Sequence, residues 1–205
     1  MITEERPMMS EIADRYRRRA DAFERKVAAV RPGQWDNPSP CEKWTARDVV
    51  GHVIDMHAVV LHHLDRTLGA APSVAEDPVA AFRSARADVE AVLDDPSLAS
   101  LECDTPTGTM TAEEDIDKIP SADLPLHGWD LARATGQDDT IDSADVESHW
   151  SAITALPADL LEQYRTPGAF GPGVEVFGPE VEVEEDAPPQ DRLLGLIGRD
   201  PQWSA

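Results

Sequence analysis

The sequence has little cysteine and no long apolar run. The chain of 205 residues has only Cys41 and Cys103, which are too few for a disulfide framework or for a zinc site of the multi-cysteine type. No segment approaches the roughly 18 apolar residues that a membrane span requires. The first residues also lack the basic and apolar stretches of an export signal. We therefore expect a cytoplasmic protein with reduced thiols and no membrane partner.

Positive charge is scarce as well. The 18 Lys and Arg residues stand against 40 Asp and Glu, which gives a formal net charge of −22 and a pI near 4.4. Such a charge repels the phosphate backbone of nucleic acids, so no nucleic-acid partner is expected. Hydrophobic residues make up 41% of the chain, enough to bury a core of ordinary size. We expect one domain with an appendage.

Apolar residues recur every three or four positions along most of the chain, which predicts a mainly α-helical protein. Thr45 and Asp48 form a capping-box pattern at the start of the second helix. Residues 104–109 are typical of a turn or short hairpin. The expected helices cover 12–30, 45–68, 78–93, a segment that restarts around Pro120 and ends near Gly136, 143–164 with a disturbance at Pro157, and 191–197.

Composition changes after Pro167. Alternating Val and Glu residues in 174–176 and 181–184 predict two short strands around a Gly-Pro turn, forming a β-hairpin packed against the helices. We therefore divide the chain into a helical domain over 8–166 and a C-terminal appendage, a hairpin and short helix, over 167–205.

Asp123 and His127 are spaced so that they could hold a metal ion together. Residues four apart on a helix point the same way, and a carboxylate and an imidazole can then bind one divalent ion with a third ligand from another helix. His52, near the start of the second helix, is the best third candidate. The alternatives are a hydrogen bond on the helix face for the pair and a core histidine for His52. The remaining histidines are assigned to packing or to solvated surface: His57, His62, His63 and His149.

Cys41 lies in a proline-flanked loop just before the second helix. It is either an activated thiolate or an inert thiol, and the second is favoured because no cation in the local sequence lowers its pKa. The sequence contains no Gly-rich phosphate loop and no Gly-x-Ser-x-Gly motif.

Two strings carry a family resemblance: WDNPSPCEKWTARDVVGH at 35–52 and HGWDLARATG at 127–136. They resemble the DinB/YfiT-like superfamily, and within it the actinobacterial branch near the mycothiol-dependent maleylpyruvate isomerase N-terminal domain. The tail at 191–201 is similar to the same branch. The resemblance implies a DinB-like up-down-down-up four-helix bundle around a metal that His52, Asp123 and His127 hold.

Asp130 and Pro125 bear on this implied site. Asp130, three residues after His127, either orients that ligand from a second shell or lies on the helix surface. Pro125 separates Asp123 from His127, so the helix must begin near Ser121 or kink there.

The resemblance and the ligand set together predict a metal-dependent enzyme of thiol chemistry. It would be a mycothiol-type S-transferase or a thiol-assisted isomerase whose partners are a small-molecule thiol and a small electrophile. Zinc is the first choice of divalent ion, although nickel, iron and manganese suit the same ligands. Two alternatives remain: a bundle that binds a metal or small ligand without catalysis, and a non-haem iron oxygenase. An exposed face of the bundle would support a homodimer.

Overall fold

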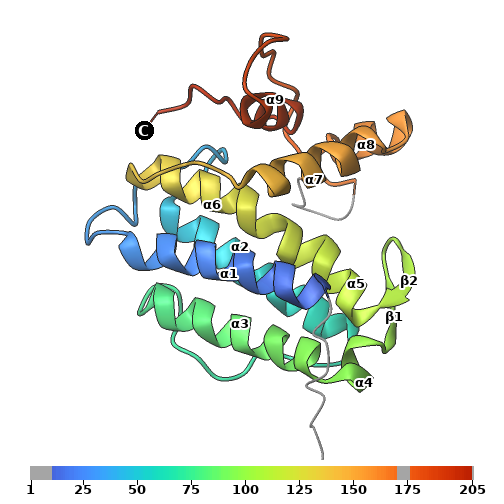
Figure 1. Ribbon diagram of the computed structural model, residues 1–205. Coiled ribbons are helices and arrows are strands. Elements are labelled where there is room, and N and C mark those ends of the chain that lie inside the picture. The colour runs from blue at the N-terminus through green and yellow to red at the C-terminus, as the bar shows by residue number, and fades with distance from the viewer. Residues whose placement is uncertain (1–10, 170–175, 205) are drawn as a thin grey trace, which may run out of the picture.

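The computed structural model describes residues 11–169 and 176–204, which form a mainly helical protein with one small antiparallel sheet (Figure 1). Among the described residues, no helix is both long and apolar enough to cross a membrane. The elements in chain order are α1 (Glu11–Ala29), α2 (Ala46–His63), α3 (Pro78–Asp94), α4 (Pro96–Ala99), β1 (Glu102–Thr105), β2 (Gly108–Thr111), α5 (Ala112–Ile116), the π-helical turn η1 (Asp117–Ser121), α6 (Ala122–Thr135), α7 (Ser143–Thr154), α8 (Ala158–Tyr164) and α9 (Pro189–Leu196).

Helices α1, α2, α3 and α6 lie side by side around the main core (Figure 1). Helices α1 and α2 each contact both α3 and α6, which closes the group. The apolar stripes predicted from helical periodicity supply this core, and its largest buried side chains are Tyr16, Phe23, Leu61, Phe82, Ile116, Leu124 and Leu131. The prediction of a mainly helical fold is confirmed.

The ends of α2 follow from local hydrogen bonding. The side chain of Thr45 accepts from the backbone N–H of Asp48, and the Asp48 carboxylate accepts from the N–H of Thr45, so the predicted capping box is confirmed. The helix ends at His63, earlier than the predicted 68. Asp65 adopts a left-handed conformation with φ 55°, which turns the chain away while Leu68 still packs against the core.

Pro125 is accommodated without a break before the predicted ligands. Helix α6 begins at Ala122, directly after the π-helical turn, as the restart predicted near Ser121 requires. Proline has no N–H to donate to the carbonyl of Ser121, four residues earlier. The Nη1 of Arg19 donates to that carbonyl instead, at 3.1 Å.

The C-terminal elements form a second apolar cluster with one face of α6. The helix predicted over 143–164 is interrupted at Pro157, as expected, and gives α7 and α8. The predicted terminal helix is confirmed as α9. Buried members of this cluster are Leu126, Trp129, Ile141, Val146, Ile153, Leu193, Leu194 and Ile197. Helix α6 therefore lies between two cores and carries the candidate site residues between them.

The β-hairpin predicted near the C-terminus is wrong where the structure can test it. Residues 170–175 lie outside the described residues, and 181–184 belong to no strand. Val181 and Val183 are half-buried, as the alternation indicates, but their partner is α9. The N–H of Val181 donates to the carbonyl of Gly195 at 2.9 Å, and a Cβ on Gly195 would lie 2.5 Å from Val183 Cγ2. The hairpin expected at 104–109 does form, between β1 and β2.

Candidate metal site

The structure brings His52, Asp123 and His127 together. His52 projects from α2, and the other two project from successive turns of α6. Oδ2 of Asp123 lies 3.3 Å from Nε2 of His52 and 3.9 Å from Nε2 of His127. One donor atom from each residue lies within 4.8 Å of the other two. Two imidazole nitrogens and one carboxylate oxygen are a ligand set that suits zinc and several other divalent ions.

Asp123 is also in the protonation state that a metal ligand requires. Burial alone would raise the pKa of this carboxyl, but its hydrogen bond with His52 and the neighbouring His127 lower it below its ordinary value. The carboxylate is therefore ionised at neutral pH, and metal ligands must be deprotonated.

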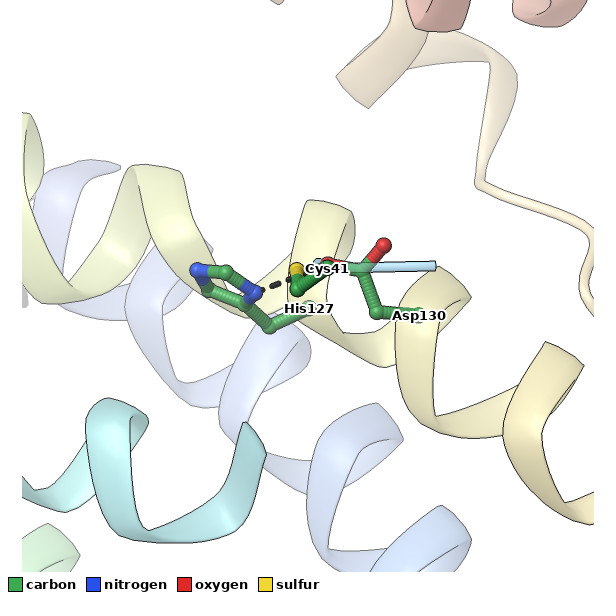
Figure 2. A group of neighbouring side chains, drawn as sticks. All are labelled: Cys41, His127 and Asp130. Carbon is green, nitrogen blue, oxygen red and sulfur yellow. Dashed lines mark hydrogen bonds and ion pairs between the residues drawn. The ribbon is translucent and has the colours of Figure 1, made fainter. Parts of the chain in front are cut away.

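Asp130 fixes the orientation of His127. Its Oδ2 lies 2.8 Å from Nδ1 of His127, and the carboxylate is completely buried. Figure 2 shows the imidazole with this nitrogen turned toward Asp130 and the other directed away. An ionised carboxylate accepts a hydrogen bond from Nδ1–H, which leaves the lone pair on Nε2 for the side where His52 and Asp123 lie. The contact is the one that the spacing of three residues predicts.

Cys41, His127 and Asp130 form a second group of potential ligands (Figure 2). This group already contains a cation, because Arg199 donates from Nε and Nη2 to the two oxygens of Asp130, each at 2.9 Å. Its Nη2 also lies 3.7 Å from Sγ of Cys41, and that thiol donates to Asp130 at 3.2 Å. The guanidinium already pairs with the one carboxylate of this group.

The pKa shifts of Asp130 and Cys41 agree with an ion pair between Asp130 and Arg199. Burial would raise the pKa of Asp130, but the charge of Arg199 and the hydrogen bond from His127 lower it well below its usual range. Burial, followed by the negative charge of Asp130, raises the pKa of the Cys41 thiol far above its ordinary value. Cys41 is a protonated thiol, which agrees with the inert thiol favoured by the sequence.

Trp44 lies against both imidazoles of the first group. Its ring centroid is 4.7 Å from that of His52 and 5.9 Å from that of His127. The indole is half-buried, so it restricts the two rings while part of it stays exposed. Lys43, just before it, has a φ of 68°, a conformation that L residues other than Asn and Asp seldom adopt.

The other histidines of α2 lie outside this site. His57 is completely buried, contacts Tyr16 Oη through Nε2 at 2.9 Å, and has its pKa lowered to about 4 by burial. His62 is exposed, as expected. The surface assignment of His63 is wrong, because its Nδ1 lies 2.8 Å from the buried carboxylate of Asp115.

Sequence reasoning missed the role of Arg199. The residue is 69 positions from Asp130, so no helical spacing connects the two. The only available signal was the tail at 191–201, whose likeness to one protein family extends over this arginine. A tail that shares a family resemblance with the two strings around the candidate ligands is a reason to expect contact between them.

The fold and site define a helical protein with a histidine and carboxylate cluster between two of its main helices. Residues 16–132, more than half of the chain, match the family described as the mycothiol maleylpyruvate isomerase N-terminal domain. The chain belongs to this family, which confirms the resemblance found in the sequence.

Relatives and solved structures extend the likeness beyond that segment. Uncharacterized proteins from two strains of Mycobacterium tuberculosis are each 29% identical over 184 residues, which cover 90% of this chain and 95% of the relative. A crystal structure of the mycothiol-dependent maleylpyruvate isomerase aligns with a TM-score of 0.53 at 20% identity, covering 77% of this chain and 73% of that one. A point mutant of that enzyme aligns with a TM-score of 0.54 at 18% identity and the same coverage. These structures share the fold of this chain.

Proposed function

We propose that this chain binds one divalent metal ion and uses a thiol of the mycothiol type to act on a small electrophile, by S-transfer or by thiol-assisted isomerisation. The observation that carries the proposal is the convergence of His52, Asp123 and His127, with Asp130 holding the histidine of α6 so that its Nε2 is available. Membership of a family named for a mycothiol-dependent isomerase supplies the class of thiol.

The residues of the chain have separate tasks in this proposal. His52 and His127 present ring nitrogens, and Asp123 presents a carboxylate that is ionised at neutral pH. Zinc is our first choice, with nickel, iron and manganese also suited; such an ion, when bound, acts as a Lewis acid and lowers the pKa of a thiol. Three protein ligands leave a coordination position open to a small molecule.

The nucleophile in this proposal is the thiol cosubstrate. Cys41 is the nearest thiol of the chain, but burial and Asp130 keep it protonated. In S-transfer, the cosubstrate sulfur forms a bond to an electrophilic carbon while a leaving group departs from that carbon with the electron pair of its bond, and the thiol proton passes to solvent. In isomerisation, the sulfur instead adds to a carbon–carbon double bond, whose π electrons move onto the neighbouring group of the electrophile; rotation about the resulting single bond follows, and the carbon–sulfur bond then breaks, which restores the double bond and releases the thiol unchanged.

Turnover assays test the catalytic proposal. Protein loaded separately with zinc, nickel, iron and manganese is mixed with a thiol and a panel of small electrophiles, and product is measured with and without the thiol. We expect thiol-dependent turnover that His52→Ala abolishes. The matched variant His62→Ala, an exposed histidine of the same helix, should retain it. Absence of thiol-dependent product with every metal would refute the catalytic proposal.

A non-catalytic binding protein is the second candidate. It is favoured by the groups around the cluster, because Asp130 is held by Arg199 and Cys41 is protonated, so neither is poised to move a proton. Tight thiol binding without product would support this candidate. Oxygen consumption by the Fe(II)-loaded protein would instead support an iron oxygenase, since two histidines and one carboxylate also describe that site.

We further propose that α1, α2, α3 and α6 form a DinB-like up-down-down-up bundle, with residues 8–166 as the metal-binding domain and 167–205 as its appendage. The mutual contacts of the four helices support the bundle. The second apolar cluster, which joins α7 and α9 to α6, supports packing of the appendage on the domain. We also propose that the protein is cytoplasmic and forms a homodimer. Sedimentation of the purified chain tests the homodimer.

A further inference from the structure

A pocket lies where α1, α6 and the start of α7 meet, apart from the candidate metal site. Its volume is about 420 Å³, within the range of small-molecule sites. Residues within 18–26 of α1 form one wall, residues within 140–145 form another, and α6 contributes the rest. His52, Asp123 and His127 take no part in the lining. A molecule in this pocket would therefore contact none of the proposed metal ligands.

The deep part of the pocket is apolar. Leu124 and Gly128 of α6 line it together with Phe23 and Ile141, and all four residues are buried. Pro125 lines it as well and is half-buried. A polar group at this depth would lose its hydrogen bonds with water without replacing them. The deep part therefore suits an apolar ring or chain.

Two arginines line the mouth of the pocket. Arg18 and Arg25 are exposed and lie seven residues apart on one face of α1, which is roughly 10 Å along the helix. Ala22 lies between them on the same face and also lines the pocket. Its methyl group does not fill the space between the two longer side chains. This space is open to a ligand within reach of both guanidinium groups.

The carboxylates around the pocket are already engaged. Oδ1 of Asp145 lies 2.7 Å from Nε of Arg19, and Oδ1 of Asp21 lies 2.7 Å from Nη2 of Arg86. Asp142 caps α7 by accepting from a backbone N–H of its first turn. These acids therefore pair with groups other than the two arginines of the mouth.

Arg18 and Arg25 have no acidic partner in the part of the chain that the structure describes. Lys26 differs, because its Nζ donates to the carbonyl of Asp138 and burial lowers its pKa. Acidic residues outnumber basic ones 40 to 18 in this chain, yet two cations beside one pocket lack a carboxylate. A guanidinium donates to a carboxylate through paired N–H groups, so an anionic ligand supplies the missing partner.

We propose that this pocket binds a small organic acid, with its carboxylate between Arg18 and Arg25 and its apolar body over the buried residues of α6. The inference goes beyond the proposed function and does not depend on it, because the pocket shares no residue with the metal cluster. Ala22 controls access, since a larger side chain there would fill the space that the ligand takes.

Calorimetry on the full chain with three probes tests the proposal. 3-Phenylpropionate has an apolar body and a carboxylate, 3-phenylpropionamide has the same body without the charge, and acetate has the carboxylate without the body. We expect the wild type to bind 3-phenylpropionate at least about 10-fold more tightly than either of the others. One hydrogen bond to a charged group, or burial of about two methylene groups, suffices for this ratio.

Removal of the two arginines should abolish the preference for the charged probe. Arg18→Gln/Arg25→Gln should bind the acid and the amide equally. Arg66→Gln/Lys118→Gln removes the same charge at exposed positions outside the pocket and should keep the preference. The Tm of each variant shows whether its fold is intact.

Filling the pocket should block the ligand without removing a charge. Ala22→Met should weaken binding of 3-phenylpropionate at least about 10-fold. Ala28→Met makes the same change at an exposed position of α1 that does not line the pocket, and it should leave binding unchanged. Equal binding by the wild type and Ala22→Met would overturn the inference.

The variant His52→Ala distinguishes this pocket from a carboxylate bound to the proposed metal ion. It should bind 3-phenylpropionate as tightly as the wild type. Loss of binding in His52→Ala, or full binding in Arg18→Gln/Arg25→Gln, would overturn the inference and leave the proposed metal site standing. Equal affinity of the wild type for the acid and either other probe would overturn it as well. A chain that binds the acid as expected but binds no metal would contradict only the proposed function.

Discussion

The buried ion pair between Asp130 and Arg199 should be strongly coupled. The Asp130 side chain has no exposed surface and that of Arg199 is 11% exposed, while two nitrogens of the guanidinium lie 2.9 Å from the two carboxylate oxygens. Removing one partner leaves the other charge buried without compensation, which costs about 3–5 kcal/mol. We therefore expect Asp130→Asn and Arg199→Met each to lower the free energy of unfolding by about this amount.

The double variant should recover much of the loss. With both charges removed, no uncompensated ion remains, so the two changes together should cost about 2–3 kcal/mol less than the sum of the separate effects. Urea denaturation of the four proteins at pH 7 measures these free energies. Additivity within about 0.5 kcal/mol would refute the coupling, as would single variants as stable as the wild type.

Measurements of zinc affinity should distinguish the role of Asp130 from that of Arg199. Asp130 contacts His127 directly, whereas Arg199 contacts it only through Asp130. Loss of a group that orients a metal ligand typically lowers affinity by about 10–100-fold. Asp130→Asn should show such a loss, both alone and in the double variant, while Arg199→Met should show a smaller one. Unchanged zinc affinity in Asp130→Asn would contradict the assigned orientation of His127.

Three further predictions test other parts of the structure. Burial lowers the pKa of His57 from the ordinary 6.5 to about 4 in the folded chain. Between these two pH values the imidazole is protonated in the unfolded chain but neutral in the folded chain. The free energy of unfolding should therefore fall by up to about 1.4 kcal/mol per pH unit as pH drops from about 6.5 to about 4. His57→Gln should flatten this slope in urea titrations, and an unchanged slope would contradict the burial of the ring. Thr45→Ala should cost about 1 kcal/mol through loss of the capping box, and a neutral result would argue against that cap. Alkylation of Cys41 by iodoacetamide at pH 8 should be at least about 10-fold slower in the native chain than in urea, and equal rates would contradict a buried, protonated thiol.

The sequence predicted those features that depend on neighbouring residues. The capping box at Thr45 and the restart near Ser121 follow from contacts within a few positions, and the structure has both. The juxtaposition of Asp123 and His127 follows from helical spacing. His52 is the best third candidate because it lies near the start of the second helix. Periodicity alone does not say which helices lie side by side, and the family resemblance implies the same three residues.

The features that the sequence did not predict depend on distant parts of the chain. The alternation at 181–184 identified the buried face, but its partner is the backbone of α9 and not another strand. His63 was assigned to the surface because its own helix does not reveal Asp115, which arrives from α5. The contact of Arg199 with Asp130 could not be predicted for the same reason, since it joins a residue of the tail to α6.

The metal content of the purified chain shows whether His52, Asp123 and His127 form a metal site. Purified chain without a metal-binding tag is incubated with zinc, nickel, iron or manganese, separated from free ions, and analysed for bound metal. We expect about one equivalent of metal per chain in the wild type, in His62→Ala and in Cys41→Ser, and loss of the metal in His52→Ala and His127→Ala. A wild type that binds none of these ions, or a chain that loses its metal in Cys41→Ser and keeps it in His52→Ala, would contradict the site.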